Sequence, residues 1–190
     1  MKSDNTRADK KLYSYVVDHD TGYAPNPFGG LCTLACCKFR KGKTGRRNIV
    51  ELAQIGDWVV GIGGASKRSS GRGKIIYAMQ VTKNIPFAEY CHSPQYRGRK
   101  DAKENSPNEP WRQALISKHF YYFGCDAKQI PKRFSEVMCG RGFKSRFSET
   151  FVQKFVAWIK THRRGKNGRP CAQEKKKSSA KVNKTPQCGC

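Results

Sequence analysis

Short runs of β-branched and aromatic residues, separated by polar stretches rich in glycine, dominate the first half of the chain. Such runs predict strands at residues 12–17, 58–62 and 74–81. Residues 114–117 and 119–123 show a similar pattern, and their aromatic density suits one face of a sheet. We therefore expect a small, mainly antiparallel sheet or a partial β-barrel.

The clearest helix signal covers residues 149–162, where apolar side chains recur on one face at helical spacing. Ser148 can cap the first turn, and Phe147 with Val152 can form a hydrophobic staple around it. We expect this C-terminal amphipathic helix to dock on the sheet. The predicted fold class is therefore α+β.

The two ends of the chain differ in composition from its middle. Residues 1–11 are polar and predict a flexible lead-in. Residues 164–190 carry many Lys and Arg and few apolar groups, so they cannot offset the entropy lost on ordering. They predict a disordered polybasic tail, which leaves residues 12–163 as one folded domain.

The net charge of the chain indicates a class of binding partner. The chain has 38 Lys and Arg against 14 Asp and Glu, a net charge of +24. Such a surplus attracts polyanions, so nucleic acid is the expected partner, with an anionic membrane surface well behind it. A solubilising tail without a specific ligand is the alternative. No run is long and apolar enough to span a bilayer, and the N-terminus lacks a secretion signal, so we expect a cytoplasmic protein without a membrane partner.

The cysteines point to packing rather than to metal. Nine cysteines are an odd number for a disulfide framework, and they suggest reduced thiols. Their spacing shows no second pair of the kind that structural zinc sites use. The sequence therefore predicts neither a metal nor a cofactor.

Three basic, glycine-rich loops are candidates for phosphate binding, because such loops expose backbone amides together with cationic side chains. They lie at residues 38–47, 63–73 and 140–147. The second loop matches neither a Walker A motif nor a dinucleotide fingerprint, and a plain flexible connection is equally expected there. The candidate phosphate ligands are Lys38, Arg40, Arg46, Arg47, Lys67, Arg68, Arg72, Arg141 and Lys144.

A stiff loop at residues 24–30 is the expected site of a nucleobase pocket. Pro25 and Pro27 fix their own φ angles and bias the residues before them toward extended backbone. Beside the turn at residues 18–22, this loop can offer aromatic rings for stacking and polar groups that read a base edge. The candidate base-binding residues are Asn26, Asp20, Tyr23, Phe28 and Trp58.

Each of these residues has a structural alternative. Trp58 and Phe28 can be core residues, since aromatic side chains dominate protein interiors. The carboxylate of Asp20 can close the turn at residues 18–22 as an Asx-turn. Asn26 stands between two prolines and has less structural reason to be Asn.

An enzymatic reading is also open. Asp20 could serve as a general base, Cys32 or Cys37 as a nucleophile with His19 near, and Lys38 as a charge stabiliser or amine nucleophile. However, the sequence shows no paired-carboxylate motif, no H-x-E zinc motif and no Ser-His-Asp arrangement. An enzyme that acts on a base or nucleotide is therefore the alternative to a binding protein.

Several motifs together resemble the nucleotide modification associated domain, type 2. They span about residues 12–160 and comprise Tyr13-Ser14-Tyr15-Val16-Val17, Asp20-x-Gly22, Ala24-Pro25-Asn26-Pro27-Phe28, Cys32-Thr33-Leu34-Ala35, Gly56-Asp57-Trp58, Phe120-Tyr121-Tyr122-Phe123-Gly124 and Gly140-Arg141-Gly142. The resemblance implies a role in making, reading or processing modified bases in DNA, commonly in phages and bacteria, so DNA is expected as the partner more than RNA. It carries over no catalytic residues, and Phe39 stands where the family pattern has proline.

A second similarity concerns the fold alone. Gly-Asp before a strand, a loop, and then Tyr77 to Val81 is similar to PUA-like barrels, including EVE and YTH domains. This similarity implies a small barrel that holds an extruded or modified base.

The sequence therefore predicts a protein that binds nucleic acid and recognises a modified or flipped nucleotide, in DNA modification or phage–host conflict. The alternatives are a base-modifying transferase or glycosylase-like enzyme, and a polybasic adaptor without base preference.

Overall fold

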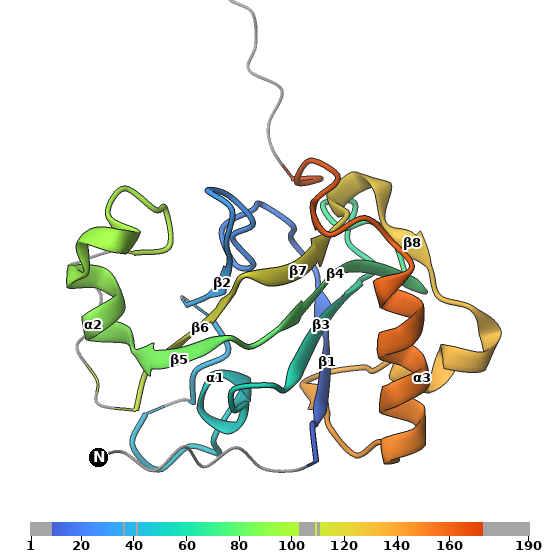
Figure 1. Cartoon of the computed structure of the whole chain (residues 1–190), viewed down its shortest axis with the longest axis horizontal. Coiled ribbons are helices and arrows are strands. Elements are labelled where there is room, and N and C mark those ends of the chain that lie inside the picture. The colour runs from blue at the N-terminus through green and yellow to red at the C-terminus, as the bar shows by residue number, and fades with distance from the viewer. Residues whose placement is uncertain (1–8, 36, 41, 103–108, 110, 173–190) are drawn as a thin grey trace, which may run out of the picture.

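The computed structural model describes residues 9–35, 37–40, 42–102, 109 and 111–172. A central sheet runs through the molecule, with helix α3 (Glu149–Lys160) on one side and a smaller sheet on the other (Figure 1). The fold class is α+β, as the sequence predicts.

The central sheet mixes parallel and antiparallel pairs. Its strand order is β10-β7-β4-β3-β1-β9, with β8 paired to β4. The strands are β1 (Leu12–Val17), β3 (Trp58–Gly63), β4 (Lys74–Gln80), β7 (His119–Tyr122), β8 (Lys128–Gln129), β9 (Phe143–Lys144) and β10 (Gly165–Lys166). β1 pairs with β3 in parallel, from Leu12 opposite Trp58 to Val17 opposite Gly63. The described strands close no barrel, so neither the partial barrel nor the PUA-like architecture is supported.

The smaller sheet has the order β2-β6-β5 and is antiparallel throughout. Its strands are β2 (Cys32–Leu34), β5 (Lys83–Pro86) and β6 (Gln113–Ser117). The short helices are α1 (Ile49–Leu52), α2 (Phe87–His92), η1 (Pro94–Tyr96), η2 (Gly124–Asp126) and η3 (Lys132–Val137). α2 follows β5 directly and packs on the outer face of this sheet (Figure 1).

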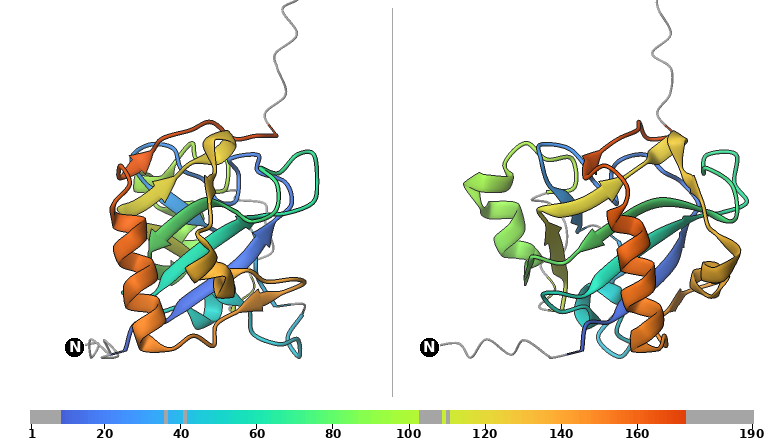
Figure 2. Two further views of the ribbon diagram at one scale, coloured as in Figure 1. Left: turned by 90° about the vertical axis from the view of Figure 1, so that its right-hand side faces the viewer. Right: turned by 45° about the vertical axis from the view of Figure 1, so that its right-hand side comes forward.

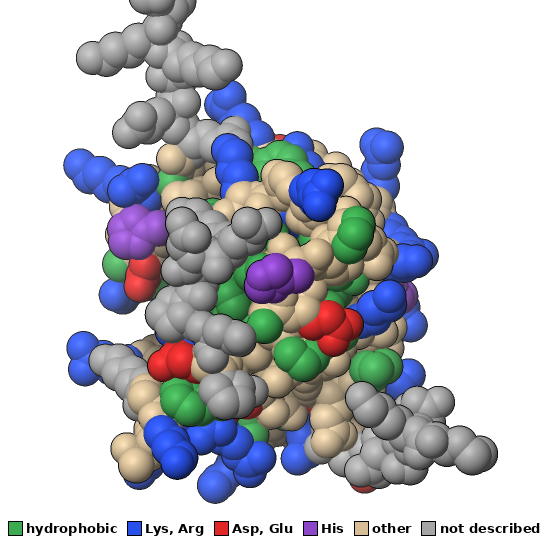
Figure 3. Space-filling model, turned by 90° about the vertical axis from the view of Figure 1, so that its left-hand side faces the viewer, with side chains coloured by type: hydrophobic (Ala, Val, Ile, Leu, Met, Phe, Trp, Pro, Cys, Tyr) green, Lys and Arg blue, Asp and Glu red, His purple; other side chains and the backbone are tan. Residues whose placement is uncertain are grey.

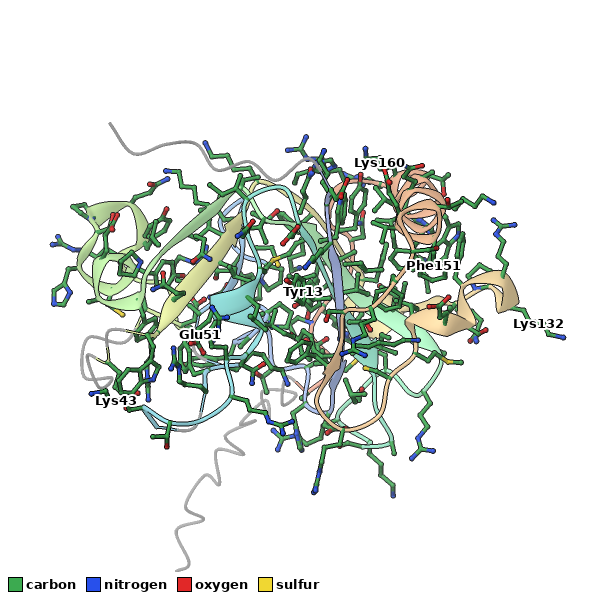
Figure 4. The ribbon with its side chains drawn as sticks, turned by 90° about the horizontal axis from the view of Figure 1, so that it is seen from below. Tyr13, Lys43, Glu51, Lys132, Phe151 and Lys160 are labelled. Carbon is green, nitrogen blue, oxygen red and sulfur yellow. The ribbon has the colours of Figure 1, made fainter. Side chains whose placement is uncertain are left out.

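The alternation of side chains along each strand divides the core into layers. Along β1, Tyr13 and Tyr15 face the smaller sheet, whereas Leu12 packs with α3. β7 divides in the same way, with Tyr122 toward the smaller sheet and Tyr121 toward α3. Seen from below, Figure 4 places the labelled ends of α3 on the opposite side of β1 from α1. Both faces of the central sheet are thus covered.

Helix α3 begins where the sequence predicts. The hydroxyl of Ser148 accepts a hydrogen bond from the backbone of Phe151 at 3.2 Å, which caps the first turn. The face that carries Val152, Phe155 and Ile159 is buried against the central sheet. Phe147 stacks on Phe151, with 5.3 Å between ring centroids.

The sequence predicted a disordered tail from residue 164, but the structure shows hydrogen-bonded backbone beyond that residue. Residues 165–172, which we call the strap, lie along the end of the sheet, and their first two form β10 beside β7 (Figure 2). The strap is held by backbone hydrogen bonds, from Asn167 to the carbonyl of Tyr122 at 2.7 Å and from Cys125 to the carbonyl of Arg169 at 2.8 Å. These bonds do not depend on apolar content, which explains why composition missed them. Residues 1–8 and 173–190 lie outside the described residues.

In the part of the chain that the structure describes, the helices are all too short or too polar to cross a lipid bilayer.

Candidate functional site

A cavity with polar walls lies where the parallel strands β1 and β3 end. We call it the glycine-rich pocket, and its volume is about 600 Å³. Strands that run in parallel present their carboxyl ends at the same edge, which is where α/β proteins commonly place ligands. Its lining residues are Val16, Asp18, Lys38, Ile62, Gly63, Gly64, Ala65, Arg72, Gly73, Met138, Cys139, Gly140, Arg141 and Gly142.

Glycines let the backbone form part of the pocket wall. A Cβ on Gly63 would overlap the carbonyl of Gly71, and one on Gly64 would overlap the carboxylate of Asp18. A larger residue at Gly63 would therefore force apart the two ends of the β3–β4 loop, and one at Gly64 would push that loop away from the turn after β1. Gly140 and Gly142, which also line the pocket, have open space around them.

Three predicted phosphate ligands, Lys38, Arg72 and Arg141, come from three separate loops and line this one pocket. The ammonium of Lys38 lies 4.3 Å from the centre of the Tyr15 ring, a cation–π contact. Lys38 adopts a positive φ of 63°, and its side chain reaches Tyr15 on β1. The hydroxyl of Tyr15 is in turn hydrogen-bonded to that of Tyr77 at 2.8 Å.

The other predicted phosphate ligands lie elsewhere. Arg40 pairs with Glu51 at 2.6 Å, and the ammonium of Lys144 donates to the carbonyl of Glu136 at 2.8 Å. The remaining four are exposed in the first two basic loops and do not line the pocket: Arg46, Arg47, Lys67 and Arg68. Sequence reasoning missed Asp18, the carboxylate on the pocket wall, which it took only for part of a turn.

Asp20 is buried and engaged by the protein itself. The hydroxyl of Tyr122 donates to one carboxylate oxygen at 2.6 Å, and the backbone of Cys171 in the strap donates to the other at 3.4 Å. The backbone of Gly22 also donates to this carboxylate, as the Asx-turn alternative requires. Burial raises the pKa of Asp20, while these hydrogen bonds oppose the rise. A carboxylate held in this way has no accessible oxygen for a base edge or for proton transfer.

Asn26 also turns inward. Its side-chain amide donates to Asp101 at 2.6 Å, within a buried network of Asn26, Thr33, Tyr90, Arg99 and Asp101. Thr33 and Tyr90 donate to the same carboxylate, and the guanidinium of Arg99 lies 3.5 Å from it. Burial raises the pKa of Asp101, opposed by these partners. Asn26 thus has a structural role that the sequence did not indicate, which is to donate a hydrogen bond to Asp101.

A second cavity, which we call the Phe28 pocket, lies beside this network. Its volume is about 380 Å³, and it is lined by Asn26, Phe28, Gly29, Arg97, Gly98, Arg99 and Lys100. The sequence predicted Asn26 and Phe28 for a base pocket but missed the cations, because residues 91–112 read as a polar excursion. Clustered Arg and Lys around Gly98 were the available signal.

Two further candidates for base binding are placed differently. Trp58 is 2% exposed and stacks on Tyr121, with His119 against its edge, so it matches the core alternative. Tyr23 is half-buried and lies outside the lining of either pocket.

Cys32 is fully buried in the core between the two sheets. Burial raises the pKa of its thiol strongly, because a thiolate there would lack solvation. A nucleophile needs the thiolate form, so this environment argues against the catalytic candidate.

A comparison with models of known protein families identifies the family of this chain. A model of nucleotide modification associated domain 2 matches residues 9–111 and 97–178. The chain belongs to this family. The resemblance seen in the motifs is thereby confirmed, and the domain 2 description associates the family with nucleotide modification. No curated protein and no solved structure matches this chain of the nucleotide modification associated domain 2 family at a significant level.

Proposed function

We propose that the protein binds nucleic acid and receives a modified or flipped nucleotide in the glycine-rich pocket, as part of DNA modification. The observation that carries this proposal is the convergence of Lys38, Arg72 and Arg141 on one cavity. These side chains come from three loops, so the chain folds to bring their charges together. Membership of the nucleotide modification associated domain 2 family agrees with a nucleotide as the ligand.

Phosphate is the group that such a pocket suits. Neighbouring cations repel one another, and an anion between them relieves that repulsion. Glycine-rich backbone allows close approach of phosphate oxygens to amide groups. The exposed carboxylate of Asp18 lines the same cavity, and a carboxylate accepts hydrogen bonds from the exocyclic amine of a base. The pocket therefore combines groups for both parts of a nucleotide.

The test compares two triple variants that remove the same charge. Lys38→Gln, Arg72→Gln and Arg141→Gln alter the pocket, whereas Arg46→Gln, Arg47→Gln and Lys67→Gln alter exposed loops outside its lining. Binding to single- and double-stranded DNA and to RNA is measured by fluorescence anisotropy at several salt concentrations. We expect the pocket variant to lose affinity and to lower the salt slope by about 2–3, as for three lost phosphate contacts.

The control variant should keep most of that slope. Equal losses in both variants would instead indicate an adaptor held by net charge alone. Recognition of a modified base is measured separately, with oligonucleotides that carry modified or plain bases and with a nucleoside profile of co-purifying nucleic acid. A preference for the modified base should survive raised salt, because it does not depend on counterion release.

The positions of the candidate catalytic residues give little support to the enzymatic alternative. Asp20 and Cys32 are buried, and only Lys38 lines the glycine-rich pocket. An enzyme would leave altered nucleosides detectable by mass spectrometry, and their appearance would favour that alternative over a binding protein.

A further inference from the structure

Phe28 stands near the tip of a tight hairpin. The backbones of Asn26 and Thr33 exchange two hydrogen bonds at 2.9 and 3.0 Å. The chain then reverses through Gly29 and Gly30, whose φ angles of 64° and 73° are those of a type I′ turn. Residues with side chains rarely adopt these angles, so the two glycines fix where the ring of Phe28 projects.

The ring is exposed but supported. It is 36% exposed and is among the three large exposed hydrophobic side chains of the described residues. A Cβ on Gly22 would lie 2.9 Å from the Phe28 ring and closer still to Pro170 in the strap, so both residues pack beside it. The ammonium of Lys166 lies 5.5 Å from the ring centre. A supported aromatic ring that remains accessible is suited to stacking.

Arg99 braces the hairpin from within. Its guanidinium donates to the carbonyl of Phe28 at 2.7 Å and to that of Asn26 at 2.9 Å, while its Nε donates to Tyr90 at 2.9 Å. The buried carboxylate of Asp101 offsets its charge. Arg99 is therefore a structural cation, and the buried network holds the loop rigid behind the pocket.

Arg97 and Lys100 are placed differently. Both are exposed and line the Phe28 pocket, and the described residues of its lining include no carboxylate. With Lys166 near the ring, they put positive charge around an accessible aromatic side chain. A ring for the base and cations for the backbone are the two components with which proteins bind single-stranded nucleic acid.

We propose that the Phe28 pocket is a second nucleotide site, where an unpaired base stacks on Phe28 and Arg97 and Lys100 hold the adjacent phosphates. The proposal rests on the proposed function for the identity of the ligand. It adds that the ligand is single-stranded or locally opened, because a base inside a duplex has no free face for stacking. An acidic peptide would satisfy the cations but would not need the ring.

The test separates stacking from charge. Phe28→Leu keeps apolar bulk against Gly22 and Pro170 but removes the π-face. Its affinity is measured for a short single-stranded oligonucleotide and for an abasic strand with the same phosphates. Base–aromatic stacking contributes about 1–3 kcal/mol, so we expect a loss of roughly 5- to 150-fold on the normal strand and little loss on the abasic one.

Two controls accompany this variant. Ile55→Ala removes an exposed apolar side chain elsewhere and should leave binding unchanged. Arg97→Gln with Lys100→Gln should lower the salt slope on single strands by about 1.4, as for two phosphate contacts. Thermal melts of all variants check that the fold is intact.

The inference is overturned if Phe28→Leu binds the normal strand as tightly as the parent, or weakens both strands by the same factor. Displacement of the strand by polyglutamate, equally in parent and variant, would point to an acidic peptide instead. Loss of binding only in the triple variant at Lys38, Arg72 and Arg141 leaves the proposed function standing while this inference fails. If instead Phe28→Leu loses binding and the triple variant keeps it, the proposed role of the glycine-rich pocket fails and that of the Phe28 pocket stands.

Discussion

At the scale of single residues, the protein places carboxylates in its interior and surrounds them with donors. Asp101 is fully buried and accepts hydrogen bonds from Asn26 and Tyr90, with Arg99 beside it. Such a group is stable only while every partner is present, since an uncompensated buried charge is costly. The network therefore controls the stability of the loop that carries Phe28.

Replacing Asp101 should have a large effect on folding. Asp101→Ala leaves the guanidinium of Arg99 without its counter-charge in a largely buried position. We expect the free energy of unfolding to fall by about 3–5 kcal/mol, measured by urea denaturation. Lys100→Ala, at the exposed neighbouring position, should change it by no more than about 0.5 kcal/mol. Equal effects of the two substitutions would contradict the role given to the network.

His119 should make stability depend on pH. Burial lowers its pKa, and Arg164 and Lys160 lower it further. The unfolded chain therefore binds a proton more readily than the folded one, so stability is full above the ordinary pKa of 6.5 and is lost as pH falls below it. We expect His119→Gln to remove this acid-side loss, measured as the melting temperature between about pH 8 and pH 5. Parallel pH profiles for parent and variant would show that another group is responsible.

Sequence reasoning placed three of its nine predicted phosphate ligands, Lys38, Arg72 and Arg141, in loops that line one pocket. It was less successful with buried polar groups. Asp20 and Asn26 were predicted to face a ligand, yet their partners are Tyr122 and Asp101, far along the chain. Local sequence carries no signal for partners at that separation.

At the scale of elements, the alternating apolar pattern located the long strands, and the capping serine located α3. The apolar pattern did not locate β8, β9 and β10, because a strand of two residues is too short to show alternation of apolar and polar side chains. Nor did it predict the parallel pairing of β1 with β3. The connection between them carries only the four-residue helix α1 and the β2 strand of another sheet, so it does not resemble a helical crossover.

The strap should be released by one added methyl group. A Cβ on Gly168 would overlap the carbonyl of Phe123, so Gly168→Ala cannot keep the strap in place. We expect loss of the backbone hydrogen bonds made by Asn167 and Ala172, and a fall of about 2–4 kcal/mol in the free energy of unfolding. Hydrogen exchange of those amides measures the first effect, and denaturation measures the second.

Arg163→Ala is the matched control, because Arg163 is exposed just before the strap. It should leave both the exchange rates and the unfolding free energy unchanged. Unaltered exchange protection in Gly168→Ala would mean that the strap tolerates the added group.

At the scale of the whole molecule, positive charge is spread widely rather than confined to one end. The face that carries α2 shows Lys and Arg side chains around its margin, with fewer Asp and Glu (Figure 3). This distribution fits the net charge of +24 and favours the encounter with a polyanion before either pocket is occupied. Composition alone gives the net charge, because net charge does not depend on the fold. The arrangement into two layers of sheet was not predictable in the same way, because it depends on pairings between distant strands.

Asp20 receives its last hydrogen bond from Cys171, 151 residues further along the chain. During synthesis, the hydrogen bonds between the strap and the turn after β1 can therefore form only after residue 172 has left the ribosome. Until then the carboxylate of Asp20 lacks the donor in the strap and has only Tyr122 and Gly22 as donors among the described residues. The contacts of this turn would thus be completed late in synthesis, after the strap has emerged.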